Sequence, residues 1–324
     1  MAEPLNATFF AFRKREQSGV LLRASIGFAV GLILIFAVFA ALLWQAFSPV
    51  IAWYGEMMAA GGDPAAMEGM TPPVGILWLV AAEIPFLFFV FVLLAAYEAA
   101  CHRWMIRGET GGGLLGLNLG ADTWRVYATY WVWFGLFIAL YIACLVVFFG
   151  LIASLLGGGA DPGVSGLIGF GAGVAIILAL LYVCVRLAPA AATSVGRRRF
   201  AFFSAWTVSS GRFWALFGAF LLLFFINIVV SIVLSVLAFS VLFAGAFANL
   251  NMADAATDPN AFSQAYLEGL TQLFSSPTMI AMVAGYYLLA GAIGLLFYVL
   301  FYGVNSRAVQ AALEEGKISA EPAD

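Results

Sequence analysis

The chain has 324 residues, of which 64% are hydrophobic and 10% are charged, and its mean hydropathy is +1.04. A soluble domain cannot cover so much apolar surface with so few polar side chains, so this composition excludes a soluble fold and favours a chain that folds in lipid. The net charge of −3 indicates little about partners, because basic and acidic residues are segregated along the chain.

Six apolar runs are long enough to cross a bilayer, which takes about 20 residues each. They lie at residues 22–53, 75–103, 123–156, 164–191, 213–248 and 278–305. The sequence therefore predicts an all-α fold, a polytopic transmembrane helix bundle. We expect residues 1–310 to form one integral membrane domain and residues 311–324 to form a short cytoplasmic tail.

The basic residues predict the orientation of these spans. All 14 Lys and Arg residues cluster around the N-terminus, the second loop, the fourth loop and the C-terminus. The loops at residues 54–74, 157–163 and 249–277 carry only acidic charges. Because Lys and Arg concentrate on the cytoplasmic side of membrane proteins, we expect both termini in the cytoplasm of a bacterial cell, with the chain in the inner membrane.

Three segments between the runs have the pattern of short interfacial helices. Two of them join aromatic side chains to arginines, a combination that favours anionic headgroups, and the third repeats large apolar side chains at helical spacing. They contain Phe9, Phe10 and Phe12; Phe200, Phe202, Phe203 and Trp206; and Phe262, Tyr266, Leu270, Leu273 and Phe274.

Repeated helical hairpins are one interpretation of this order. The pair Ser210-Gly211 follows Ser18-Gly19 at a distance of 192 residues, and each pair precedes an arginine and a span. Glycines are concentrated in the fourth run, where Gly169 and Gly173 are spaced for close helix packing. We expect their partner to be the first run, through Gly27 and Gly31.

Glu83 is an acid inside the second run. An ionisable group within a membrane indicates a functional site, here a proton carrier or a ligand for a polar substrate. The structural alternative is a protonated Glu83 that hydrogen-bonds Asn227, Ser231 or Ser235 of the fifth run and locks the bundle. The pattern leaves both open.

Glu98 and His102 are four residues apart and share one helical face. The pair favours a local ion pair at headgroup level, since a catalytic pair needs a nucleophile or a metal that the sequence does not supply. His102 is the only histidine in the chain, so one subunit cannot hold a multi-histidine metal site. We expect no enzyme activity, no cofactor and no metal.

A basic collar around the fourth loop is a candidate site for lipid headgroups. The same residues are also explained by topology control, and the two explanations are compatible. The collar consists of Arg186, Arg197, Arg198, Arg199 and Arg212.

Two stretches resemble a known family. They read RWMIRGE and LGLNLGADTWR within residues 103–125, and RLAPA, AWTV and GRFW within residues 186–214. They resemble the cytoplasmic loops of uncharacterised six-span inner-membrane proteins of proteobacteria, which are distantly similar to the membrane domain of some glycerophosphoryl diester phosphodiesterases. The resemblance covers about residues 5–310 and implies a membrane fold rather than an activity, because no soluble stretch here is long enough for a catalytic domain.

These features favour a non-enzymatic inner-membrane protein that binds lipid or a partner protein and serves envelope organisation or assembly. The expected partners are membrane lipids, together with a protein partner or a second copy of the chain, and not nucleic acid. The alternative is a small-solute or lipid transporter that is proton-coupled through Glu83.

Overall fold

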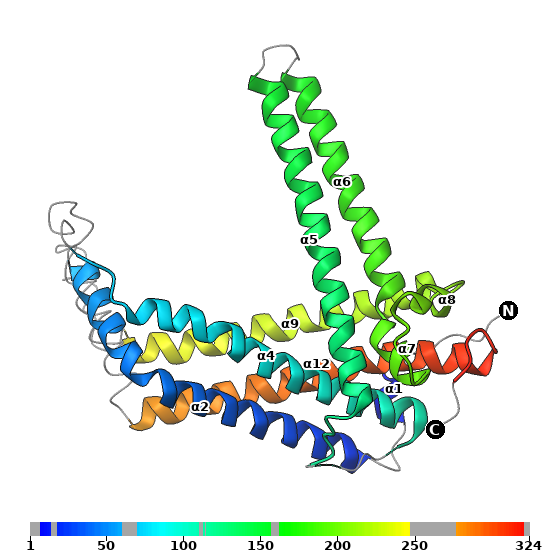
Figure 1. The fold of residues 1–324 in the computed structure, drawn as a ribbon, viewed down its shortest axis with the longest axis horizontal. Helices are drawn as coiled ribbons and strands as arrows, with labels where there is room; N and C mark the ends of the chain where they lie inside the picture. The colour runs from blue at the N-terminus through cyan, green and yellow to red at the C-terminus, as the bar shows by residue number, and fades with distance from the viewer. Residues whose placement is uncertain are drawn as a thin grey trace. The chain divides into compact units, whose positions relative to one another are not determined.

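The computed structural model describes residues 7–13, 18–59, 70–109, 113, 115–156, 162–246 and 277–320. These residues form helices joined by turns and short loops, and none of them forms a strand. Six of the described helices are long and apolar enough to cross a membrane (Figure 1). The predicted all-α polytopic architecture is confirmed.

The six long helices follow the predicted runs closely. They are α2 (Ser18–Ala59), α4 (Gly75–His102), α5 (Ala121–Leu156), α6 (Pro162–Leu187), α9 (Phe213–Ala246) and α12 (Pro277–Glu314). The largest difference is at the end of α12, which continues past the last apolar residues. Its 38 residues span about 57 Å by the helical rise, against about 30 Å of hydrocarbon, so α12 reaches beyond the apolar layer.

Five short helical elements accompany the spans: α1 (Phe10–Arg13), the π-helix η2 (Arg103–Arg107), α7 (Ala190–Gly196), the 3-10 helix η3 (Phe202–Ser204) and α8 (Ala205–Val208). In the two described aromatic segments, Phe10 and Phe202 are buried, whereas Phe9 and Phe203 are exposed. These segments therefore pack one ring inward and leave another outside. The third predicted interfacial helix lies outside the described residues.

The chain divides into two compact units, each described by itself. Unit 1 comprises Met1–Ala11 and Trp214–Val304, and unit 2 comprises Phe12–Phe213 and Asn305–Asp324. In unit 1, α9 and α12 meet through the stacked rings of Phe220 and Phe301, whose centroids are 6.1 Å apart.

Unit 2 contains two pairs of neighbouring helices. Helices α2 and α4 lie side by side, and so do α5 and α6 (Figure 1). The two backbones of the α2–α4 pair are close at Gly75, where a Cβ would stand 2.7 Å from the carbonyl oxygen of Ala46. Further along, the rings of Phe28 and Tyr97 are 5.0 Å apart. The pair is therefore joined both by a close backbone approach at a glycine and by a contact between aromatic rings.

The most tightly packed part of unit 2 lies at the end of its helices that carries the arginines. We call this part the basic-end core. It comprises η2, α7, η3, α8 and the adjoining ends of α4, α5, α6 and α12. Alanines dominate its interior and allow the backbones to approach closely. Its two buried clusters contain Ala95, Ala99, Val126, Ala191 and Val195, and Leu187, Ala190, Phe202 and Ala205.

The predicted packing of the first run against the glycines of the fourth is wrong. Gly27 of α2 contacts Leu115 and Leu117, and Gly31 contacts Leu93 of α4. Gly173 of α6 has open space where a Cβ would stand. The matched Ser-Gly pairs also differ in backbone, because Gly211 is left-handed at a φ of +74° while Ser18-Gly19 opens helix α2. The hairpin repeat stays a prediction.

Candidate functional site

A network of polar side chains, of which only Tyr130 is half-buried and the others are buried, runs through the basic-end core and is centred on His102. The Nδ1 atom of His102 is 2.8 Å from the Ser306 hydroxyl oxygen, and Nε2 is 3.2 Å from Glu98 Oε1. Tyr130 donates its hydroxyl to Glu98 Oε2 over 2.5 Å. Each nitrogen of the imidazole ring therefore has a hydrogen-bond partner within the protein. The network joins α4, α5 and α12.

The sequence places Glu98 and His102 on one face of α4, and the structure adds Ser306 and Tyr130. A hydroxyl, an imidazole and a carboxylate in series is the arrangement of a nucleophilic site. His102 and Ser306 are, however, fully buried. Since a nucleophile needs space for its substrate, this geometry supports a structural network that fixes the end of α12 against α4 and α5.

A second cluster gathers arginines around Asp122, near the start of α5. Its carboxylate lies 2.5 Å from Arg107, 2.7 Å from Arg125 and 3.9 Å from Arg103. The π-helical turn η2 brings Arg103 and Arg107 to this carboxylate, and Gly108 ends the turn in the left-handed conformation at a φ of 69°. Three cations share one buried anion, so Asp122 holds η2 against α5.

Glu109 extends this cluster to α7. It pairs with Arg107 and with Arg198, each at 2.8 Å. Arg198 follows α7 with a φ of 56°, an uncommon value for a residue with a side chain, and this conformation accompanies its contact with Glu109. The second loop and the fourth loop are thereby joined by salt bridges.

Two other residues of the predicted collar bind the C-terminal segment. Arg197 donates to the hydroxyl of Ser204 at 2.8 Å and to the carbonyl of Ser319 at 3.3 Å, while Arg212 pairs with Glu315. The hydrogen bond from Lys317 and the charge of Arg212 lower the pKa of Glu315 below its ordinary value. Headgroup binding by Arg197, Arg198 and Arg212 stays a prediction, and each already has partners within the chain.

Arg199 differs from these residues because its side chain is exposed, at the surface of the loop that follows α7.

Arg186, near the end of α6, is held by aromatic rings. Its guanidinium carbon is 4.6 Å from the centroid of the Trp206 ring and 5.9 Å from that of Tyr182, distances at which a cation is attracted to a ring face. Arg186 is 8% exposed, and its Nε is buried without an acceptor. The described residues supply no carboxylate to this cation.

Glu83 and Asn227 lie in different units. Glu83 is exposed on α4 of unit 2, and within the described residues no hydrogen bond or ion pair reaches its carboxylate. Asn227 is half-buried on α9 of unit 1. Their pairing stays a prediction. Among the described residues, no three His, Cys, Asp or Glu side chains gather closely enough to hold a metal ion.

No protein-family model, curated protein or solved structure matches the chain. The resemblance to the membrane domain of glycerophosphoryl diester phosphodiesterases therefore stays a prediction.

Three residues are central to these networks but are not among the site residues predicted from the sequence. Ser306 and Tyr130 complete the His102 network, and Asp122 anchors η2. A signal existed for Ser306, because it adjoins Arg307 after the sixth run, and the basic residues predict this end on the same side of the membrane as Glu98 and His102. Nothing in the spacing indicated Tyr130, since a tyrosine in an apolar run is equally consistent with a lipid-facing position.

Proposed function

We propose that this chain is a non-enzymatic protein of the bacterial inner membrane, with both termini in the cytoplasm, that binds membrane phospholipid and serves envelope organisation or assembly. The observation that supports it is the exposed aromatic surface of the basic-end core. Phe203 is 69% exposed and Trp206 is 40% exposed, beside the arginines of the fourth loop. Amphipathic rings next to cations favour the headgroup region of a membrane.

The test is the lipid content of the purified protein. The protein is extracted in a mild detergent, washed until free micelles carry no phospholipid, and its retained lipids are quantified against the lipids of the source membrane. We expect retained phospholipid that is enriched in anionic headgroups, and a lower ratio of lipid to protein in Phe203→Ser. Phe225→Ser is the matched control, since Phe225 is an exposed ring within α9.

Retained lipid with the composition of the bulk membrane, unchanged in Phe203→Ser, would contradict the lipid-binding proposal. A stoichiometric protein that co-purifies in place of lipid would favour the version with a protein partner, and a stable dimer would favour a second copy of the chain.

Transport is the second candidate, supported by the exposed carboxylate of Glu83, about 12 Å along the candidate membrane span α4 from its start at Gly75. An unpaired intramembrane acid is expensive and indicates a functional role. If Glu83 couples protons to transport, Glu83→Gln folds normally and abolishes proton-dependent flux in proteoliposomes. Flux that persists in Glu83→Gln removes Glu83 from the mechanism.

A further inference from the structure

We propose that Arg186 and the apolar groove between α5 and α6 form a binding site for one anionic glycerophospholipid. The phosphate lies on Arg186 and one acyl chain lies along the groove. This inference rests on the proposed lipid-binding function, and it names the site and the class of lipid.

The first feature of this site is the buried charge of Arg186. Three arginines are buried among the described residues, and two of them have a carboxylate: Arg103 lies 3.9 Å from Asp122, and Arg212 pairs with Glu315. For Arg186, the described residues supply only the rings of Trp206 and Tyr182. A desolvated guanidinium needs a counter-charge, and at the end of a membrane span the abundant anion is a lipid phosphate.

The rings around Arg186 suit this ligand. Trp206 and Tyr182 restrict the guanidinium to one position, so little side-chain entropy remains to be lost when an anion binds. The ring centroid of Phe213 is 5.1 Å from that of Tyr182, so Phe213 adds a third aromatic ring to this group. Aromatic residues of this kind occupy the level of the headgroups in a bilayer.

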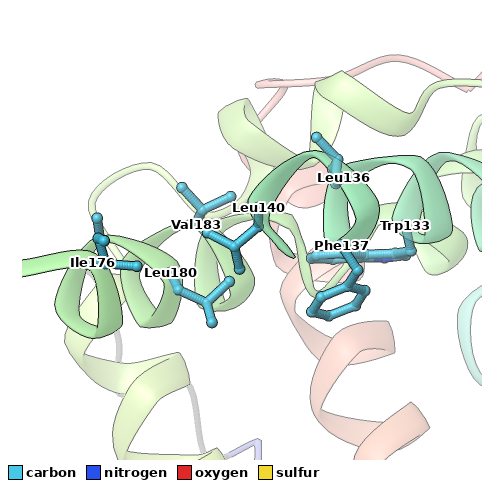
Figure 2. Close-up of a pocket in the computed structure, with 8 residues that line it drawn as sticks. Trp133, Leu136, Phe137, Leu140, Ile176, Leu180 and Val183 are labelled. Atoms are coloured by element: carbon cyan, nitrogen blue, oxygen red, sulfur yellow. The ribbon is translucent and has the colours of Figure 1, made fainter. Parts of the chain in front are cut away.

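The second feature of this site is the apolar groove. It encloses about 330 Å³ between α5 and α6, a volume at the lower end of those that hold small molecules (Figure 2). Figure 2 shows only hydrocarbon and aromatic side chains along it. An acyl chain fits such a lining because it needs no hydrogen bond. The lining includes Trp133, Leu136, Phe137, Ile176, Leu180 and Val183.

The groove and Arg186 are neighbours along helix α6. Val183, at one end of the groove, precedes Arg186 by three residues in α6, or about 4.5 Å along the helix axis. The ring centroids of Trp133, in the groove, and Phe202 are 5.7 Å apart. Phe202 lies one turn before Trp206. The groove therefore ends against the short helices that carry Trp206. This separation suits a glycerol group between phosphate and acyl chain.

The test is a lipid titration of the full-length protein in detergent, followed by native mass spectrometry. The probes are phosphatidylglycerol, phosphatidylcholine with the same acyl chains, and inorganic phosphate. The variants are Arg186→Gln and, as the matched control, Arg23→Gln, which removes the same charge from an exposed residue at the start of α2. We expect Arg186→Gln to weaken phosphatidylglycerol binding by about tenfold or more, as expected for a lost charge-assisted hydrogen bond. Arg23→Gln should stay within about twofold of the wild type.

A second pair of variants tests the groove. Ala179→Phe places a ring in the groove, whereas Ala175→Phe places one on the same helix outside its lining. Both positions are exposed, so both variants should fold. We expect Ala179→Phe, and not Ala175→Phe, to weaken phosphatidylglycerol binding by about fivefold, which follows from the loss of one or two buried methylenes. If Arg186→Gln fails to fold, this pair decides the question.

Each outcome separates the site from the function. If the wild type binds phosphatidylglycerol and both Arg186→Gln and Ala179→Phe bind it equally well, the site is wrong and the proposed function stands. If the wild type binds no lipid, the proposed function fails with it. Displacement of the lipid by inorganic phosphate at similar concentration would overturn the lipid assignment in favour of a free-phosphate site.

Discussion

Ser306→Ala tests the buried His102 network, because Ser306 ties the end of α12 to α4. The substitution removes the hydroxyl that lies 2.8 Å from Nδ1 of the fully buried His102. An unsatisfied buried polar group costs about 1–3 kcal/mol in soluble proteins, while interhelical hydrogen bonds in membranes contribute about 0.6 and at most about 1.7 kcal/mol. Since this site is fully buried in protein, we expect a loss of about 1–2 kcal/mol in the free energy of unfolding.

The assay is reversible unfolding in mixed micelles of mild detergent and dodecyl sulfate, followed by tryptophan fluorescence. Ser240→Ala is the matched control, because Ser240 is exposed and its hydroxyl donates to the carbonyl of Val236 in the same helix. That substitution should change the free energy of unfolding by less than about 0.5 kcal/mol.

Tyr130→Phe removes the other end of the same chain of hydrogen bonds. Since both bonds meet at the Glu98–His102 pair, the double variant should deviate from additivity by about 0.5 kcal/mol or more. Equal stability of Ser306→Ala and Ser240→Ala would refute the network as a stabilising element.

Three further predictions concern packing and charge. Asp122→Asn leaves three arginines around a neutral group and should lower the free energy of unfolding by about 3 kcal/mol or more. Glu314→Gln, in an exposed pair, should lower it by less than about 1 kcal/mol in the same assay. The pKa of Glu315 is lowered in the folded protein, so its contacts stabilise the C-terminal segment above the ordinary glutamate pKa of about 4.3 and are lost as the pH falls below it. The rate of amide hydrogen exchange in residues 316–320, corrected for the intrinsic rate, should rise at acidic pH in the wild type. In Glu315→Gln it should be high at all pH values. A corrected rate that does not change with pH in the wild type would contradict this role of Glu315. Gly75→Ala should destabilise the protein by about 1–3 kcal/mol, because the added methyl meets the carbonyl oxygen of Ala46 at 2.7 Å. Gly171→Ala, where the added methyl meets open space, should be neutral or stabilising. Equal effects of the two substitutions would contradict the α2–α4 contact.

The number and limits of the spans could be predicted from the sequence because lipid imposes a simple rule. A helix that crosses a membrane needs about 20 apolar residues, and runs of this length are unambiguous. The end of α12 was placed too early, at residue 305, because its last turns pack in the basic-end core rather than in lipid. Their alternating small and polar residues, such as Ala308 and Gln310, carry no hydropathy signal although Ala308 is buried.

The pairing of side chains could be predicted only within one helix. Helical spacing placed Glu98 and His102 together, and the structure confirms their contact at 3.2 Å. Contacts between helices depend on which faces meet, and hydropathy does not encode this. For that reason Gly27 and Gly31 were assigned to the wrong neighbour. The arginines of the collar were predicted together as one candidate site for lipid headgroups, yet they differ in partners: Arg212 has Glu315, while Arg186 has two aromatic rings.

The most direct test of the lipid-binding account is a structure of the protein in nanodiscs that contain phosphatidylglycerol, at a resolution that resolves side chains and lipids around Arg186. The account predicts a phosphate within hydrogen-bond distance of the guanidinium and an acyl chain between α5 and α6. A guanidinium paired with a carboxylate of the protein itself, with no lipid ordered beside it, would contradict the account.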